Sequence, residues 1–183
     1  MVRLTVRHCA VVVLLLCGAA ALAQPQTRLA EAQIKAAFLY KFGGFVEWPE
    51  RAFARADAPF TIGVVGSDAV AAELRQVVTG RTVHQRPIAV RNLRRGEPLS
   101  GLHILFVGQS EAARLPEILA AAKGQPVLVV TESEDALAHG SMINFVAVDD
   151  RVRFDVALPP AERGQLKISA RLLTVARKVV SSG

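Results

Sequence analysis

Three short apolar segments limit the folds open to this chain more than any other feature. They are PFTIGVVG at 59–66, HILFVG at 103–108 and QPVLVVTES at 125–133. Strands with almost continuous apolar runs are typical of parallel sheets that are buried on both faces. The segments between such strands must then supply helices that cover the sheet.

Helical segments alternate with these strands. Ser67 or Asp68 caps a predicted helix at 67–78, and Ser110 caps another at 111–124. The remaining predicted elements are a first helix from Glu31 at least to Gly43, a strand at 86–93, a short helix at 134–140, a hairpin at 141–158, and a last helix from Ala161 to about Val180 in which Gly164 is a candidate break. We predict an α/β fold, a three-layer sandwich with a largely parallel sheet, an antiparallel edge hairpin and helices on both faces.

The first predicted helix carries an unusual number of aromatic residues. Seven of the ten aromatic residues fall between positions 38 and 60. Ile34, Phe38, Phe42 and Phe45 repeat at helical spacing, which predicts one apolar face. Lys41 falls among them, and it either reaches the carbonyls at the helix end or meets a carboxylate of a partner.

The N-terminus has the features of a secretory signal peptide. Arg3 and Arg7 precede an uncharged apolar run at 10–23, which closes on small residues. We predict cleavage between Ala23 and Gln24, export to the periplasm, and one domain at 24–183; an uncleaved anchor is the alternative. Both cysteines, Cys9 and Cys17, lie in the signal peptide, so we predict no disulfide in the mature chain.

The charge balance is mildly basic. The whole chain carries a net charge of +6, and removing Arg3 and Arg7 from the 22 basic residues leaves +4 against the 16 acidic ones. In an exported protein nucleic acid is an improbable partner. An anionic membrane surface or an acidic patch on a partner protein fits this charge better, and an ordinary solvated basic face fits it equally well.

No motif indicates catalysis. His84, His103 and His139 lack the spacing of metal ligands, and neither Ser67 nor Ser110 lies in a nucleophile elbow. The acidic cluster at 132–135 is most simply the first turn of a helix, where carboxylates are favoured. We predict no catalytic residue, no metal site and no cofactor.

A small-molecule site has one default position in such a fold. Gly66, Ser67, Gly108 and Ser110 all follow strands, and the carboxyl ends of parallel strands are where these sheets bind ligands. The four residues are therefore a candidate ligand crevice, although ordinary tight turns are the commoner explanation of such a pattern.

Five segments together resemble the YfiR family of periplasmic proteins. They are QIKAAFLYKFGGFVEWP at 33–49, TIGVVGSD at 61–68, HILFVGQSE at 103–111, GSMINFVAVDDRVRFDVAL at 140–158 and LKISARLLTVAR at 166–177. The resemblance implies a regulator that binds the periplasmic domain of an inner-membrane diguanylate cyclase and represses it, lowering cyclic di-GMP and biofilm formation. It also implies a homodimer. The alternative function is a periplasmic small-molecule sensor with its ligand at the strand-end crevice.

The resemblance also directs attention to the FVEWP segment. Trp48, the only tryptophan, is either a core residue at the helix end or part of an interface or ligand pocket. If Trp48 is part of an interface or pocket, the candidate partner or ligand site consists of four residues: Phe45, Glu47, Trp48 and the more distant Arg171. In the best-known member of the family redox control depends on disulfide cysteines, and the mature chain here has none.

Overall fold

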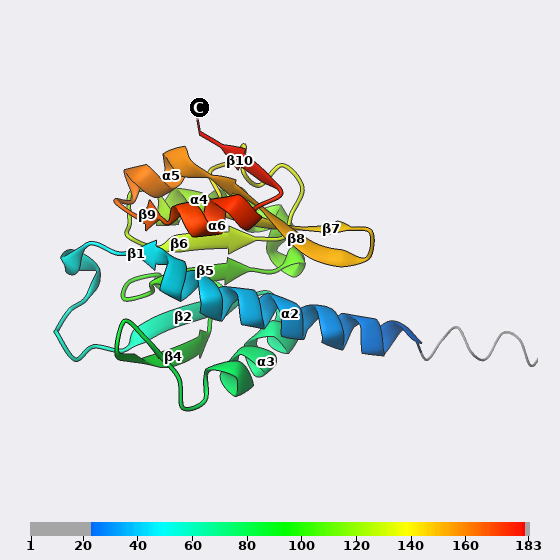
Figure 1. The fold of residues 1–183 in the computed structure, drawn as a ribbon, viewed down its shortest axis with the longest axis horizontal. Helices are drawn as coiled ribbons and strands as arrows, with labels where there is room; N and C mark the ends of the chain where they lie inside the picture. Colours follow the sequence, from blue (N-terminus) through cyan, green and yellow to red (C-terminus); the bar gives the residue numbers. More distant parts are fainter. Residues whose placement is uncertain (1–22, 182–183) are drawn as a thin grey trace, which may run out of the picture.

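The computed structural model describes residues 23–181, which form a curled main sheet of eight strands and a separate two-stranded sheet, with helices packed on the main sheet (Figure 1). The strands of the main sheet lie in the order β10-β8-β7-β6-β5-β2-β4-β3. Their bounds are Phe60–Val65 (β2), Thr82–Val83 (β3), Arg86–Asn92 (β4), Ile104–Val107 (β5), Leu128–Thr131 (β6), Ile143–Val148 (β7), Arg151–Ala157 (β8) and Lys178–Val180 (β10). The central strands β4, β2, β5, β6 and β7 are parallel neighbours, whereas β7 and β8 form an antiparallel hairpin.

Helices cover both faces of this sheet, which confirms the predicted three-layer α/β sandwich. The helices are Ala23–Phe45 (α2), Asp68–Val78 (α3), Leu115–Ala122 (α4), Leu158–Arg163 (α5) and Ala170–Val175 (α6), with short 3-10 turns at Glu50–Ala52 (η1) and Gln109–Arg114 (η2). Figure 1 shows α2 crossing in front of the sheet beside α3 and α6, with α4 behind. Successive residues of each buried strand therefore face different helices.

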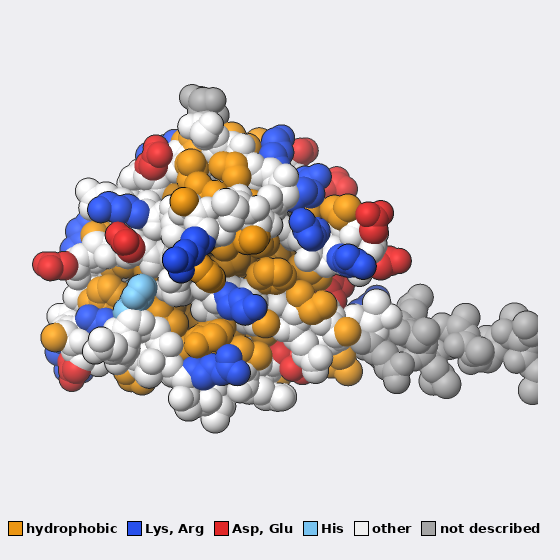
Figure 2. Space-filling model, in the orientation of Figure 1, with side chains coloured by type: hydrophobic (Ala, Val, Ile, Leu, Met, Phe, Trp, Pro, Cys, Tyr) orange, Lys and Arg blue, Asp and Glu red, His pale blue; other side chains and the backbone are white. Residues whose placement is uncertain are grey.

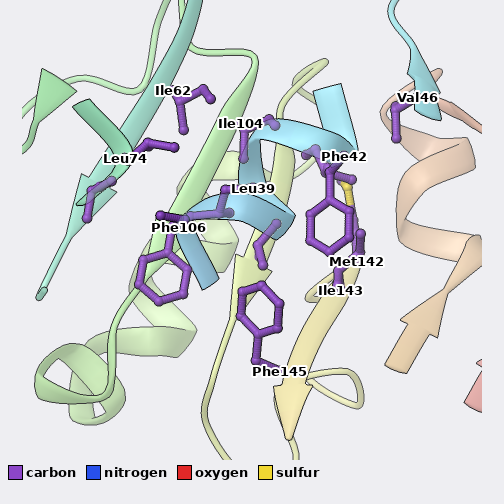
Figure 3. Packing of buried hydrophobic residues seen from close by; sticks show 14 of the residues in the cluster. Leu39, Phe42, Val46, Ile62, Leu74, Ile104, Phe106, Met142, Ile143 and Phe145 are labelled. Carbon is purple, nitrogen blue, oxygen red and sulfur yellow. The ribbon is translucent and has the colours of Figure 1, made fainter. Parts of the chain in front are cut away.

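The core has two parts, one on each face of the sheet. On the α2 face, Leu39 and Phe42 lie against Phe106 and Phe145 (Figure 3), and the rings of Phe42 and Phe145 stack at 5.9 Å. On the other face, the neighbouring residue Leu105 belongs to a second cluster with α4. The alternation within β5 shows that the apolar run HILFV is buried from both sides, as its composition predicts.

The prediction of a single last helix is wrong. Instead of one helix after Ala161, the chain forms α5, a two-residue strand Lys167–Ile168 (β9), α6 and β10. Gly164 ends α5, Gln165 has a φ of 60°, and the Ser169 hydroxyl caps α6 through the amide of Leu172. Because β10 adds to β8 in parallel, the β7–β8 hairpin is one strand inside the edge of the sheet.

Two further expectations need correction. The buried face of α2 includes Ala32, Ala36 and Leu39 as well as Phe42, and Ile34 at the start of the predicted aromatic face is 43 % exposed. The helix ends at Phe45, and the next two residues form the short strand Val46–Glu47 (β1). The segment 134–140 consists of turns, not of a helix.

The N-terminal prediction lies largely outside the described part of the chain. Residues 1–22 are not described, while Ala23 and Gln24, on either side of the predicted cleavage site, are the first residues of α2. Within residues 23–181, no helix is both long and apolar enough to cross a bilayer.

Candidate functional site

The FVEWP segment lies beside the C-terminal region, a proximity that periodicity alone could not predict. Strand β1 pairs antiparallel with β9, which places Glu47 opposite Lys167. The amide of Ser169 donates to the carbonyl of Phe45 at 2.9 Å. As a result, Arg171 in the first turn of α6 lies near Phe45 in the last turn of α2.

Exposure divides the four candidate residues of this region. Glu47 and Arg171 are exposed, whereas Phe45 and Trp48 are half-buried and pack against the main core. The indole ring of Trp48 meets Phe60 edge-on at 4.9 Å, and its Nε1 donates to the carbonyl of His103 at 3.1 Å. Trp48 therefore has a packing role, and its role in binding a partner stays a prediction.

His103 is the centre of this aromatic corner. Its ring is 2 % exposed and is stacked between Phe53 at 4.4 Å and Phe60 at 4.8 Å. Burial, assisted by the nearby positive charge of Arg86, lowers the pKa of His103 to about 4. The histidine is therefore neutral at pH 7.

The hydrogen bonds of His103 define its tautomer. Its Nδ1 accepts from the amide of Thr61 at 3.0 Å, so the proton is on Nε2. That Nε2 is buried and has no hydrogen-bond partner among residues 23–181, although the backbone of Ala52 is close enough to raise the pKa of His103 slightly against the effect of burial. The corner thus contains an unsatisfied donor beneath aromatic rings.

An open hollow of about 670 Å³ lies outside this corner. Its walls include the side chains of Glu47, Trp48, Phe53, His84 and Arg86. The guanidinium of Arg86 lies 3.9 Å from the centre of the Phe53 ring and donates to the carbonyl of Ala58 at 2.8 Å. Aromatic and cationic groups at this position suit the binding of a planar or anionic group, and they provide no nucleophile–base pair.

Six of the eight residues that line this hollow were not predicted from the sequence, among them Phe53, His84 and Arg86. The only signals available were the density of aromatic residues before position 60 and the loose arginine cluster after position 80. His84 and the following Gln85 form the turn between β3 and β4, where both have positive φ angles of 50° and 64°. Such backbone angles are uncommon in residues other than glycine.

The four residues of the predicted crevice are brought together by the fold. The hydroxyl of Ser110 donates to the carbonyl of Gly66 at 2.9 Å, and the amide of Gly108 donates to Val65 at 2.8 Å. A Cβ atom on Gly66 would lie 2.8 Å from the Ser110 hydroxyl oxygen, and one on Gly108 would clash with the Gly66 backbone. The turns pack directly on one another, and their ligand-binding role stays a prediction.

An open pocket lies farther along the same sheet edge. It has a volume of about 740 Å³ and lies between α2, the residues after β5 and β6, and the β7–β8 hairpin. At its polar end, the ammonium of Lys35 forms ion pairs with both Glu31 and Glu132. The second oxygen of Glu132 accepts from the amide of Gln109 at 2.7 Å.

The two carboxylates decide the protonation of Lys35. Burial by itself lowers the pKa of a lysine, but hydrogen bonds and charge interactions with Glu132 and Glu31 outweigh burial, so the pKa of Lys35 is raised. Lys35 was not predicted to be a site residue, and Glu132 was predicted to lie in the first turn of a helix. The two residues are 97 positions apart, so no local pattern could have paired them.

The outer surface of α2 and α6 forms a third feature, which we call the α2–α6 face. It contains Ile34, Lys41 and Phe45 of α2 and Arg171 and Val175 of α6. Val175 is 57 % exposed, and neither Lys41 nor Arg171 has an ion pair within the described residues. Figure 2 shows apolar surface over these two helices, with lysine and arginine side chains around it.

A metal centre is not assembled in the described part of the chain. Within residues 23–181, no group of three or more histidine, cysteine, aspartate or glutamate side chains is arranged to hold a metal ion.

Comparison with known proteins places the chain in a family. A family model described as YfiR/HmsC-like matches residues 32–177, from the middle of α2 to the residue before β10. No curated protein matches the chain. This family is regulatory and not catalytic. The chain therefore belongs to the YfiR/HmsC-like family, whose members are periplasmic regulators of diguanylate cyclase signalling.

Proposed function

We propose that the mature chain binds the periplasmic domain of an inner-membrane diguanylate cyclase and holds the cyclase inactive. Repression lowers cyclic di-GMP and, through it, biofilm formation. The observation that carries the proposal is the family match over residues 32–177. The family match by itself specifies neither the cyclase that is bound nor the state in which it is held; both are parts of this proposal.

The α2–α6 face is the surface that we assign to this partner. It combines an exposed apolar side chain on each helix, Ile34 and Val175, with the unpaired cations Lys41 and Arg171. Apolar anchors within a charged rim are the usual composition of a protein interface. The two helices also come from segments that carry the family resemblance, 33–49 and 166–177.

Repression requires that the chain distinguish two states of the cyclase. A shift from 99:1 to 1:99 in favour of the inactive state needs a binding preference of about 5.5 kcal/mol. A few well-packed anchors supply energies of this size in known interfaces. No catalytic step by the chain itself is needed.

The test combines capture with a cellular readout. The tagged chain is expressed with its own N-terminal segment, recovered from the periplasm, and analysed for a bound cyclase, while cyclic di-GMP is measured in a deletion strain. We expect capture of a membrane cyclase and raised cyclic di-GMP on deletion. Absence of both results would contradict the proposal and leave only the family assignment.

Charge reversal then tests the surface. Arg171→Glu together with Lys41→Glu should weaken cyclase capture by at least about tenfold, because cations at an interface steer and hold an acidic partner. Arg94→Glu together with Arg95→Glu is the matched control, because both are exposed cations in the loop whose apolar residues pack against the opposite, α4 face. Equal loss in the control would show that total charge, and not the α2–α6 face, is responsible.

A further inference from the structure

The pocket beside Lys35 has the dimensions of a small-molecule site. Its volume of about 740 Å³ falls in the usual range for such sites. It opens at the carboxyl ends of β5 and β6, where Gln109 and Glu132 follow the strands, and α2 and the β7–β8 hairpin form its sides. In an open parallel sheet, ligands bind outside the carboxyl ends of the strands.

One side of this pocket is apolar. Phe145 forms a buried part of the wall, Val152 of the hairpin is half-buried, and Ile34 at the rim is 43 % exposed. An apolar wall that remains open to solvent favours a ligand with a hydrocarbon portion, because covering it removes apolar surface from water.

The opposite end of the pocket has an excess of negative charge. Glu31 and Glu132 share the single ammonium of Lys35, and the hairpin contributes Asp150 and Arg151, whose charges offset one another. The Glu132 side chain is only 14 % exposed and that of Lys35 only 11 %, so water screens these two charges weakly, whereas Glu31 is 45 % exposed and accessible to a ligand. One carboxylate charge is therefore left without a fixed cation of its own.

The protonation of Lys35 gives a second indication of the sign of the local potential. Burial disfavours a charged ammonium, yet the pKa of Lys35 is raised by its two carboxylates. The environment therefore favours positive charge strongly enough to overcome the cost of burial. A second cation placed beside Glu31 would encounter the same two carboxylates together with the positive charge of Lys35, which leaves a surplus of one negative charge to attract it.

We infer that this pocket binds a small aliphatic amine, with its ammonium group at Glu31 and Glu132 and its hydrocarbon chain along Ile34, Phe145 and Val152. An anion of the same shape would meet the surplus carboxylate, and a neutral alcohol would leave that charge uncompensated. The inference goes beyond the proposed function, because amine binding requires no cyclase.

Direct binding to the purified protein tests the assignment. The probes are hexylamine, hexanol and hexanoate, which share one hydrocarbon chain and differ in the charge of the head group. The full chain is expressed with its own N-terminal segment and titrated by calorimetry without any partner. We expect hexylamine to bind at least about tenfold more tightly than either of the other two, the effect of one charge-assisted hydrogen bond.

Two variants locate the binding site. Glu31→Gln removes the more exposed of the two carboxylates and should weaken hexylamine about tenfold, bringing it close to hexanol. Ile34→Trp enlarges a side chain at the open rim and should abolish binding of hexylamine without a loss of stability. Glu117→Gln is the control, since Glu117 belongs to a comparable local ion pair on α4, on the other face of the sheet.

The possible results separate this inference from the cyclase proposal. Equal affinities for the three probes, or hexylamine binding that neither Glu31→Gln nor Ile34→Trp changes, would overturn the amine assignment. Amine binding in a chain that captures no cyclase would support this inference while the proposed function fails.

Discussion

Lys35 and His103 are two buried bases at opposite ends of the same parallel strands, and the fold treats them in opposite ways. Lys35 lies at the carboxyl ends of the strands between two carboxylates, which raise its pKa. His103 precedes β5 at the other end, between two aromatic rings, and its pKa is lowered to about 4. Burial lowers the pKa of both groups: the two carboxylates outweigh this effect at Lys35, whereas the positive charge of Arg86 adds to it at His103.

The difference indicates what each end of the sheet can do. The Lys35 end is charged, open and lined on one side by apolar groups, which suits a ligand that exchanges with solvent. At the other end the His103 side chain itself is neutral and is sealed from the outer hollow by aromatic stacking, which suits a rigid support for the adjacent FVEWP segment. Three measurements follow from this contrast.

The largest expected effect on stability comes from removing the positive charge of Lys35. Lys35→Met keeps the length of the side chain but leaves Glu132 buried without its cation, so we expect the free energy of unfolding to fall by about 3 kcal/mol. Urea denaturation of the purified chain measures the change. Arg55→Met removes the cation of a fully solvated ion pair and should change stability little. A small effect of Lys35→Met would show that the ion pairs are not coupled to folding.

Because His103 is buried in its neutral form, we expect the stability of the fold to depend on pH. Because the pKa of His103 is lowered from 6.5 to about 4 in the fold, the unfolded chain binds one more proton than the folded chain between these values. The stabilisation is complete above pH 6.5 and is lost as the pH falls toward 4, by about 2–3 kcal/mol in total. Urea denaturation at pH 7, 5.5 and 4 measures this slope.

A variant isolates the histidine from other titrating groups. His103→Gln retains a side chain that accepts from Thr61 but cannot take up a proton, so its stability should vary less with pH by the same 2–3 kcal/mol. The comparison of slopes holds even if the variant is less stable throughout. Identical slopes in the two proteins would contradict the assignment of a neutral buried histidine.

The two ends also show which features a sequence makes visible. The strands β2, β5 and β6 and the β7–β8 hairpin were predictable, because apolar runs and alternation are local patterns. The contacts that define both ends are not local. Glu132 meets Lys35 across 97 positions, and the indole of Trp48 meets the His103 carbonyl across 55.

The C-terminal region was mispredicted for a related reason. Its apolar residues Leu166, Leu172 and Leu173 fit a helical period, but β9 and β10 are strands of two and three residues that exist because β1 and β8 are available to pair with them. The Gly164-Gln165 break was the only local signal. Arg177, next to β10, forms an ion pair with the buried Asp155, which further fixes this strand in place.

The smallest expected effect is that of a Trp48 variant, which distinguishes a supporting role of the indole in the fold from a direct contact with the partner protein. Trp48→Phe retains an aromatic ring against Phe60 and removes the indole N–H that donates to the His103 carbonyl, so the free energy of unfolding should fall by about 1 kcal/mol. If Trp48 acts as a support for the sealed end, cyclase capture by the variant should equal that of the unaltered chain once both are fully folded. If capture falls by tenfold or more while stability falls by only about 1 kcal/mol, the half-exposed indole contacts the partner directly. The interface would then extend from the α2–α6 face across β1 to the sealed end, and the contrast between an open binding end and a closed supporting end would no longer hold.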